Sequence, residues 1–344
     1  MSNRGLTAEP IEREQSCDLC LGKLFEVISR RDRRGNNLTT VVCARCGLVS
    51  HLQIPTDEQL ANYYGKSYRH DYHGEIAPSP RRVIRAWNTG QAIFRRVHGF
   101  LRPGDRVFEV GAGIGCTVKA FELAGYDASG IEPGEGFHAF SQRRLHARVE
   151  NRMLGEVPRC PTYDFVLLVH VIEHFHSPGR ALRHIHDILA PGGRLYVACP
   201  NLGAPHAAPG NLFHFAHVYN FTHRTLTMLG RACGFRTVRR LSPNNDRDLM
   251  MVFERQDEGH LQIDPEGYPE TMRAITRYNV LSYHLRPRYW AQRGRTVIQH
   301  LSERVRSQRR LERIVALCDE HRRQAQVCST SEGVEFSPDR RLAG

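Results

Sequence analysis

The chain has 344 residues, of which 40% are hydrophobic and 24% are charged, a composition that excludes a fibrous or fully disordered protein. Its 48 Lys and Arg residues against 36 Asp and Glu residues give a net charge of +12, but nearly all the basic residues are arginine, which a GC-rich gene would also produce. No apolar run is long enough to cross a bilayer, and residues 1–15 are polar without an apolar signal core, so we expect a soluble cytoplasmic protein of two or three domains.

The first segment, residues 12–80, contains four of the ten cysteines as two Cys-x-x-Cys pairs. The pairs flank two β-like stretches, Leu24–Ser29 and Leu38–Val42, which a turn-rich loop joins. Two such pairs on a hairpin present four thiolates to one tetrahedral ion and leave no open position. We therefore predict a zinc ribbon with a structural Zn²⁺, and four unrelated thiols are the alternative. The predicted ligands are Cys17, Cys20, Cys43 and Cys46.

A tyrosine-rich stretch, residues 62–72, follows the predicted ribbon. Its rings could cover a ligand pocket, or a helix here could dock the ribbon onto its neighbour. Both interpretations stay open, and the stretch serves as a connector to the second segment.

The second segment, residues 81–255, alternates strand and helix patterns, which predicts a mostly parallel sheet covered on both faces. The predicted helix that ends at Leu189 should stop before Pro191-Gly-Gly193, and these glycines turn the chain into the next strand. The expected strands are Arg106–Val110, Ala128–Ile131, Phe165–Val171, Leu195–Cys199, Phe235–Leu241 and Leu249–Glu254, and the expected helices include Ser177–Leu189 and Thr222–Ala232.

The third segment, residues 256–325, is predicted to be a basic helical extension, and residues 326–344 a disordered tail. Between residues 270 and 323 there are 13 arginines and 5 acidic residues, so most of the surplus charge lies here. These helices could contact a partner or an acidic substrate or form a homo-oligomer, and solvated arginines are the alternative. Their apolar residues at roughly helical spacing are Val297, Leu301, Val305, Leu311, Val315 and Cys318.

A glycine-rich turn, Gly111-Ala-Gly-Ile-Gly115, directly follows the apolar strand that ends at Val110. Glycines let the backbone approach a ligand closely, and free N–H groups at the start of the next helix favour a negative group. The third glycine comes one residue earlier than in the G-x-G-x-x-G loop of dinucleotide enzymes. Glu109, just before the turn, would help to neutralise a cationic ligand and would face a pyrophosphate badly.

The next predicted strand ends at Ile131, which puts Glu132 at the carboxyl edge of the sheet. Open α/β folds bind ligands at this edge, and a carboxylate there can accept both hydroxyls of a ribose. We expect Glu132 to bind a nucleoside, and a solvated acid at a strand end is the alternative.

Four motifs, in their order and spacing, resemble class I S-adenosylmethionine-dependent methyltransferases over about 150 residues. They are Phe108-Glu-Val-Gly-Ala-Gly-Ile-Gly115, Gly130-Ile-Glu132, Tyr163-Asp-Phe-Val-Leu-Leu-Val-His-Val-Ile-Glu-His174 and Leu189-Ala-Pro-Gly-Gly-Arg-Leu-Tyr-Val197. The resemblance implies an α/β fold: a Rossmann-like class I methyltransferase sheet with a small N-terminal zinc ribbon and a C-terminal helical extension.

With its ribbon, the chain looks like a bacterial group of zinc-ribbon methyltransferases related to sugar and natural-product methyltransferases. Gly47-Leu-Val49 and Tyr63-Tyr64 match the signature of that group ahead of the core. The chain departs from the ribbon-bearing sugar C-methyltransferases, which end in a large second α/β domain where this chain has basic residues. A specific sugar substrate therefore does not follow from the resemblance.

The resemblance implies that the glycine loop holds the methionine part of S-adenosylmethionine. Gly111, Ala112, Gly113 and Gly115 would wrap it. Glu109 would face its ammonium group directly or through water.

The same resemblance implies that Glu132 binds the ribose of the cofactor. Met153 and Leu154 lie where the family packs the adenine. His170 ends the strand that borders the methyl group in this fold and would line the cofactor pocket.

Three histidines are candidate bases, which the reaction needs only if the acceptor must lose a proton. His170 ends a strand, His174 begins the loop after it, and His217 lies in an aromatic segment, residues 211–222, that could form a substrate wall. His174 could instead cap or pack the following helix. A metal bound by His170, Glu173, His174 and His176 is a weaker alternative, because residues so close in one turn rarely point at one ion.

We expect S-adenosylmethionine-dependent methyl transfer to an oxygen or nitrogen of a small-molecule or glycan acceptor, in polysaccharide or secondary-metabolite biosynthesis. RNA methylation is the alternative, because a ribbon ahead of this core also resembles certain ribosomal RNA guanine methyltransferases. Both the basic residues 30–34 of the ribbon and the basic C-terminal extension could hold RNA phosphates. The second alternative is a non-enzymatic assembly protein on a methyltransferase scaffold. The intact glycine loop and Glu132 argue against it, because a scaffold has no use for them.

Overall fold

The computed structural model describes residues 9–62, 78–204, 208–244, 246–278, 280–286, 290 and 307–327. The tyrosine-rich stretch from residue 63 on, the apolar residues Val297, Leu301 and Val305, and the tail from residue 328 lie outside the described residues. Within the described part of the chain, no helix combines the length and the apolar character needed to cross a membrane.

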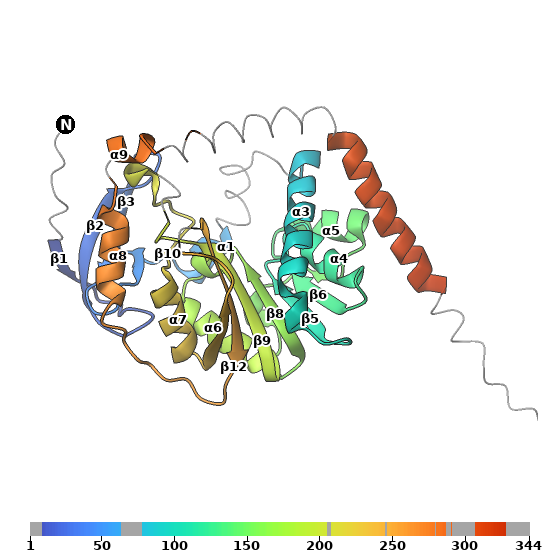
Figure 1. The fold of residues 1–344 in the computed structure, drawn as a ribbon, viewed down its shortest axis with the longest axis horizontal. Helices are drawn as coiled ribbons and strands as arrows, with labels where there is room; N and C mark the ends of the chain where they lie inside the picture. The colour runs from blue at the N-terminus through green and yellow to red at the C-terminus, as the bar shows by residue number, and fades with distance from the viewer. Residues whose placement is uncertain are drawn as a thin grey trace, which may run out of the picture.

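A seven-stranded sheet forms the centre of the molecule, in the order β11-β12-β9-β8-β5-β6-β7 (Figure 1). Parallel pairing joins the five strands from β9 to β7, whereas β12 runs antiparallel to both β9 and β11. The prediction of a mostly parallel sheet is thus confirmed. The strands are β5 (Arg106–Val110), β6 (Asp127–Ile131), β7 (Val149–Glu150), β8 (Tyr163–Val169), β9 (Leu189–Pro200), β11 (Phe235–Arg240) and β12 (Asp248–Arg255).

Helices cover both faces of this sheet, with α3 (Pro80–Val97), α4 (Cys116–Glu122) and α5 (Glu135–Leu145) on one face (Figure 1). On the other face lie α6 (Pro178–Ile188) and α7 (His223–Ala232). Side chains of β8 alternate between the two cores: Phe165 and Leu167 pack with α3 and α4, and Val166 and Leu168 pack with α6 and α7. The short 3₁₀ helices are η2 (His98–Phe100), η3 (Leu154–Glu156), η4 (Ile172–His174) and η5 (Pro209–Asn211).

Several strand boundaries differ from the prediction, and two of the differences have a clear local cause. β8 ends at Val169, before the predicted Val171, because His170 adopts a positive φ of 55° that no strand can continue. β9 starts at Leu189 directly after α6, so Pro191-Gly-Gly193 lies within this strand, where its register with β8 shifts. The two-residue β7 was not predicted, because so short an element leaves no pattern in the sequence.

A second sheet, the small sheet, has five antiparallel strands in the order β1-β2-β3-β4-β10. Cys43 ends β3, and the other three paired cysteines lie in loops beside this sheet. The predicted hairpin is β2–β3, and the fifth strand, β10, comes from the chain after β9 and pairs with β4. Cysteines of the first segment and side chains of α6 and α7 belong to one hydrophobic cluster. Its strands are β1 (Glu9–Glu12), β2 (Leu24–Arg31), β3 (Asn37–Cys43), β4 (Val49–His51) and β10 (Tyr219–Asn220). Helix α1 (Asp57–Asn62) follows β4 in the chain.

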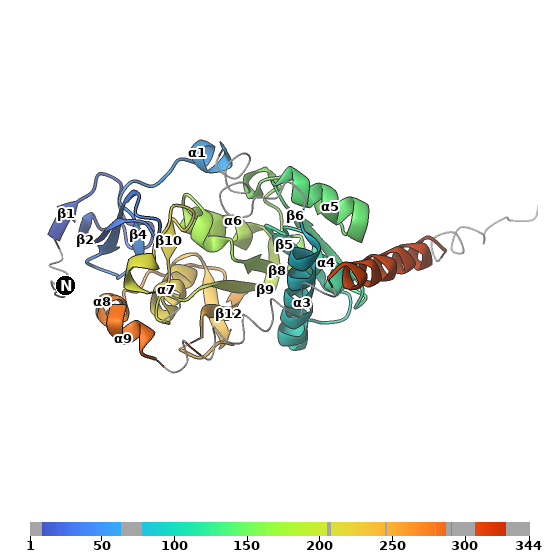
Figure 2. The same cartoon turned by 90° about the horizontal axis from the view of Figure 1, so that it is seen from above.

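The described parts of the C-terminal segment lie at two separate places (Figure 2). Helices α8 (Gly267–Thr276) and α9 (Val280–His284) lie beside the small sheet, where Thr271 Oγ1 donates to Gly47 O at 2.9 Å. Residues 307–327 form a helix beside α3 and α4, and its apolar side chains Leu311, Ile314 and Cys318 are buried in that core.

Candidate functional site

The loop between β5 and α4 turns on three glycines with positive φ, 73° at Gly111, 56° at Gly113 and 80° at Gly115. A Cβ on Gly111 would lie 2.5 Å from Val171, and one on Gly115 would lie 2.7 Å from Ser141, so both glycines serve the packing. A Cβ on Gly113 would meet nothing within 4 Å. The loop therefore presents its backbone to open space at Gly113, where a ligand can approach.

Glu132 bridges the glycine loop and the start of the next helix. Its Oε2 accepts a hydrogen bond from Gly113 N–H at 3.0 Å, and its Oε1 accepts one from Gly134 N–H at 2.8 Å. A carboxylate oxygen can accept more than one hydrogen bond, so a side chain of this kind can also bind hydroxyl groups. The structure thus brings the predicted loop and the predicted ribose ligand into direct contact.

Glu109 is only 3% exposed and lies on β5 just before the loop. Burial raises the pKa of its carboxyl group to about 8; Thr117 and Val118 N–H of α4 lower this pKa, and Glu132 raises it. Among the described residues, Oε2 of Glu109 has no hydrogen-bond partner. A cation brought close to this atom would favour the ionised carboxylate.

The residues predicted to pack an adenine differ in exposure. Met153, between β7 and η3, is 43% exposed, whereas Leu154 is 8% exposed and belongs to the hydrophobic core. Ala112 is also buried, and its N–H donates to Ile131 O at 2.8 Å. Met153 is therefore the residue here with apolar surface to offer a flat ring.

His170 lies at the carboxyl end of β8 with its side chain 45% exposed. Its Nδ1 is 3.5 Å from Glu173 Oε1, and its Nε2 is 3.9 Å from Asp248 Oδ1. Burial lowers the pKa of His170, but the carboxylates of Glu173 and Asp248 raise it above its usual value overall. Asp248 was not predicted as a site residue; it reaches this edge because β12 runs antiparallel to β9 and therefore begins here.

Glu173 is the centre of the histidine cluster and is 1% exposed. Three imidazole nitrogens face its Oε1: His170 Nδ1 at 3.5 Å, His174 Nε2 at 3.7 Å and His217 Nε2 at 3.9 Å. Burial would raise the pKa of Glu173, but His174 and His170 lower it. The structure thus gathers all three candidate bases around one buried carboxylate.

His174 has a defined tautomer because its Nδ1 lies 2.6 Å from Ala216 O, and a carbonyl oxygen can only accept. Its Nε2 therefore faces Glu173. The His217 ring centre lies 5.0 Å from that of His174 and 3.7 Å from that of His214. His214 is buried, and burial and the charge of Arg33 lower its pKa to about 3, so this ring is neutral at pH 7.

The structure changes the set of residues that could bind a metal in the histidine cluster. Glu173, His174 and His217 offer ligand atoms within 4.8 Å of one another. His176, which the sequence placed in this group, instead has its Nδ1 2.7 Å from Pro55 O. Residues from one turn therefore do not supply the whole group, and His217 from the segment before β10 completes it.

The four cysteines of the two Cys-x-x-Cys pairs are buried together, with their Sγ atoms within 4.8 Å of one another. The Sγ atoms of Cys17 and Cys46 are 3.6 Å apart, and those of Cys20 and Cys43 are 3.4 Å apart. Four sulfurs at about 2.3 Å from one tetrahedral Zn²⁺ would be about 3.8 Å apart. The donor set and its geometry therefore fit a closed Zn²⁺ site.

The cysteine-bearing part of the chain contacts the segments on both sides of the histidine cluster. Asp18, which lies between the first two cysteines, accepts hydrogen bonds from Ser177 Oγ at 2.6 Å and Gly179 N–H at 2.7 Å at the start of α6. On β4, His51 Nε2 lies 3.0 Å from Phe215 O, next to Ala216. The segments on both sides of the cluster are thus held by the cysteine-bearing sheet.

The family model described as a methyltransferase domain matches residues 80–240. Among curated proteins, the ubiquinone biosynthesis O-methyltransferase of Acinetobacter baumannii is 29% identical over 108 residues, which cover 28% of this chain and 45% of that protein. An uncharacterised protein of Mycobacterium tuberculosis is 28% identical over 121 residues, 33% of this chain and 41% of its own length. The chain thus spans less than half the length of these relatives.

Two solved structures are also similar to this chain. The 1,6-didemethyltoxoflavin-N1-methyltransferase of Burkholderia thailandensis, with S-adenosylhomocysteine bound, gives a TM-score of 0.46 at 22% identity and covers 64% of this chain and 96% of its own. The magnesium protoporphyrin IX methyltransferase of Synechocystis gives a TM-score of 0.45 at 15% identity and covers 58% of this chain and 100% of its own.

Proposed function

We propose that this chain, in which residues 80–240 form a methyltransferase domain, transfers a methyl group from S-adenosylmethionine to an oxygen or nitrogen atom of a small-molecule or glycan acceptor. The observation that carries the proposal is the β5–α4 loop, where Gly113 borders open space and donates its N–H to Glu132. A loop of this kind brings backbone and carboxylate to a nucleoside ligand at the carboxyl edge of a sheet.

In this proposal, residues of the loop region hold the cofactor. Gly111, Gly113 and Gly115 wrap its methionine part, Glu132 accepts hydrogen bonds from the ribose hydroxyls, and Glu109 balances the ammonium charge. When bound, S-adenosylmethionine supplies an electrophilic methyl group on a sulfonium. Because the transfer is an in-line displacement, the main task of the chain is to align the acceptor.

His170 is the proposed general base. It is the most exposed of the three histidines that face Glu173, at 45% against 14% for His174 and 21% for His217. Glu173 faces its Nδ1, and Asp248 faces its Nε2. Both carboxylates stabilise the imidazolium that forms when His170 takes a proton from the acceptor. His174 and His217 then act as positioning residues for Glu173.

We further propose that Cys17, Cys20, Cys43 and Cys46 hold one structural Zn²⁺. The four-sulfur set has no room for a water or substrate ligand, which argues for a structural role. Elemental analysis should give about one zinc per chain, as expected for one such site. Cys43→Ser should lose the metal, whereas Cys160→Ser, which changes an exposed thiol, should keep it.

Calorimetry with S-adenosylmethionine tests the cofactor site. Wild type should bind, and Gly113→Arg should not, because the new side chain fills the open space at the loop. Gly104→Arg is the matched control, since Gly104 also has a positive φ, 86°, and nothing within 4 Å of its Cβ. Absence of binding by wild type, or equal loss in both variants, would overturn the cofactor proposal.

Transfer of a labelled methyl group tests the acceptor class. Label should pass to components of a small-molecule or polysaccharide extract and not to total RNA. Label found only in RNA would refute the proposed acceptor while leaving the methyltransferase proposal in place.

A further inference from the structure

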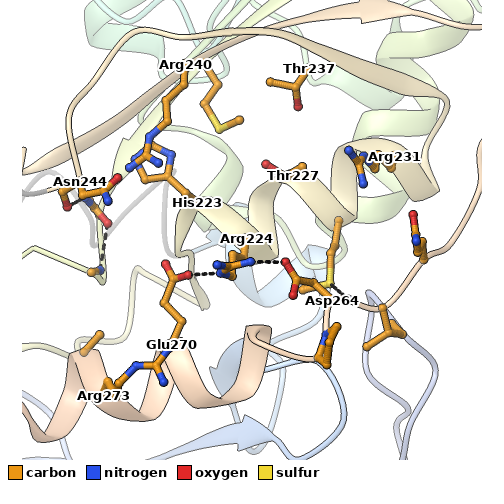
Figure 3. Close-up of a pocket in the computed structure, with 18 of the residues that line it drawn as sticks. His223, Arg224, Thr227, Arg231, Thr237, Arg240, Asn244, Asp264, Glu270 and Arg273 are labelled. Atoms are coloured by element: carbon orange, nitrogen blue, oxygen red, sulfur yellow. Dashed lines mark hydrogen bonds and ion pairs between the residues drawn. The ribbon is translucent and has the colours of Figure 1, made fainter.

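A cavity of about 1250 Å³ lies between α7, α8 and the strands β11 and β12 (Figure 3). Its lining includes Asn201 after β9, Asn244 in the β11–β12 loop, and residues 262–265 before α8. None of the residues proposed above for the cofactor, the base or the zinc lines it. The cavity therefore needs its own explanation.

The cavity wall carries a marked excess of positive charge. Arg224 binds both lining acids, Asp264 and Glu270 (Figure 3). Arg273 pairs with Glu266 at 2.8 Å. The other lining arginines, which make no ion pair with an acid among the described residues, are Arg231, Arg240 and Arg277.

Next to this charge lies a buried histidine. His223, the first residue of α7, is 8% exposed, and neither ring nitrogen has a hydrogen-bond partner among the described residues. Figure 3 shows its ring beside the guanidinium group of Arg240. Thr237 on β11, another lining residue, has a buried hydroxyl that is likewise without a partner among the described residues.

Buried polar groups in folded proteins are nearly always hydrogen-bonded, because leaving them unpaired is costly. Two such groups lie at one cavity wall, beside three arginines that make no ion pair with an acid among the described residues. Arg240 Nε donates to Ser242 O at 3.2 Å, which leaves its other N–H groups to bind an anion. Guanidinium groups favour phosphate, since their paired N–H donors match its oxygens. A phosphate group also offers three acceptor oxygens and up to two negative charges, against two oxygens and one charge for a carboxylate.

We infer that this cavity binds the phosphate or diphosphate group of a small organic molecule. Arg231, Arg240 and Arg277 would neutralise the phosphate oxygens, and His223 and Thr237 would each donate one hydrogen bond. The volume is larger than inorganic phosphate needs and exceeds the roughly 300–1,000 Å³ of typical ligand pockets, so it leaves room for a whole organic molecule. The inference does not depend on the proposed methyl transfer.

Inorganic pyrophosphate is the probe for the test, measured by calorimetry on the full zinc-loaded chain. Wild type should bind one pyrophosphate saturably and more weakly as salt is added. Arg240→Gln should weaken binding about tenfold or more, since it removes a charge-assisted hydrogen bond. Arg236→Gln, the control, changes an exposed arginine of the same strand that pairs with Glu254 and should bind as wild type does.

His223→Leu separates binding from folding. Leucine has a similar size and no polar atoms, so the free protein should melt at the same or a higher temperature while pyrophosphate binding weakens. A histidine with a purely structural role would give a lower melting temperature and unchanged binding.

Three results would overturn the inference: no binding of pyrophosphate by wild type, equal loss of binding in the Arg236 control, or binding of short single-stranded RNA that depends on Arg240 and that pyrophosphate cannot displace. Unchanged affinity for S-adenosylmethionine in Arg240→Gln would show that this site and the cofactor site are independent, which the inference requires.

Discussion

Glu109→Gln removes the ionisable group beside the glycine loop and keeps the size of the side chain. The folded chain holds the pKa of Glu109 at about 8, mainly because of burial, against the ordinary value of 4.5. Between these two values the folded state binds a proton that the unfolded state has lost. Stability therefore falls as pH rises from about 4.5 and stops falling above about 8, where both states are ionised.

The size of this effect follows from the two pKa values. The difference between about 8 and 4.5 corresponds to at most about 5 kcal/mol of stability lost across this pH range. The glutamine side chain in the Glu109→Gln variant cannot ionise and escapes this loss. Urea unfolding of both proteins from pH 5 to pH 9 should show the variant gaining on wild type as pH rises. A stability difference that does not change with pH would refute the assignment of the raised pKa.

Cofactor binding adds a second, independent readout. If Glu109 balances the ammonium group, binding requires its ionised form and releases a proton below pH 8. With a pKa of about 8, wild type should bind S-adenosylmethionine about 50-fold more tightly at pH 8 than at pH 6. Calorimetry should show this dependence in wild type and not in Glu109→Gln. The same pH dependence in both proteins would exclude Glu109 as the partner of the ammonium.

Three further predictions concern other parts of the site. His170→Asn should lower turnover about 10²- to 10⁴-fold without changing cofactor affinity, and only wild type should lose activity as pH falls through the raised pKa of His170, which pH–rate profiles would reveal. Gly111→Ala should lower the melting temperature more than Gly113→Ala, because only the first clashes with Val171, whereas Gly113→Ala should lose more cofactor affinity by calorimetry. Asp18→Asn should cost about 1–2 kcal/mol in urea unfolding by weakening the start of α6, whereas the exposed Asp57→Asn should cost less than about 1 kcal/mol.

The fold was largely predictable because local signals agreed with the tertiary structure. The apolar strand before Gly111 and the glycine turn after it identify β5 and the start of α4. The spacing of the cysteines likewise predicts their cluster, since four thiols can meet at one ion only if the hairpin between them forms. In both cases a short stretch of sequence contains all the residues that specify the local structure.

The histidine cluster was only partly predictable, because its residues come from separate elements. The sequence names His170, His174 and His217 but gives no sign that all three face Glu173. Asp248 could be found only by knowing that β12 runs antiparallel to β9, which no local pattern reveals. The cavity between α7, α8, β11 and β12 was missed for the same reason. Its arginines come from separate elements, and the sequence shows them as scattered basic residues.

The pairing of β10 with β4 connects the proposed zinc site to the histidine cluster, and zinc removal tests that connection. Tyr219 lies opposite Ser50, and His51 N–H donates to Val218 O at 3.0 Å, so the segment that carries Ala216 and His217 is held by the cysteine-bearing sheet. Chelation should therefore raise hydrogen exchange in residues 214–220 and lower turnover. The glycine loop makes its contacts with Glu132 and Ile131 inside the large sheet, so affinity for S-adenosylmethionine should stay within about twofold, a small free-energy change. Loss of cofactor binding in parallel with turnover would mean that the small sheet supports the whole fold. Unchanged exchange in residues 214–220 would mean that β10 keeps its place without the metal.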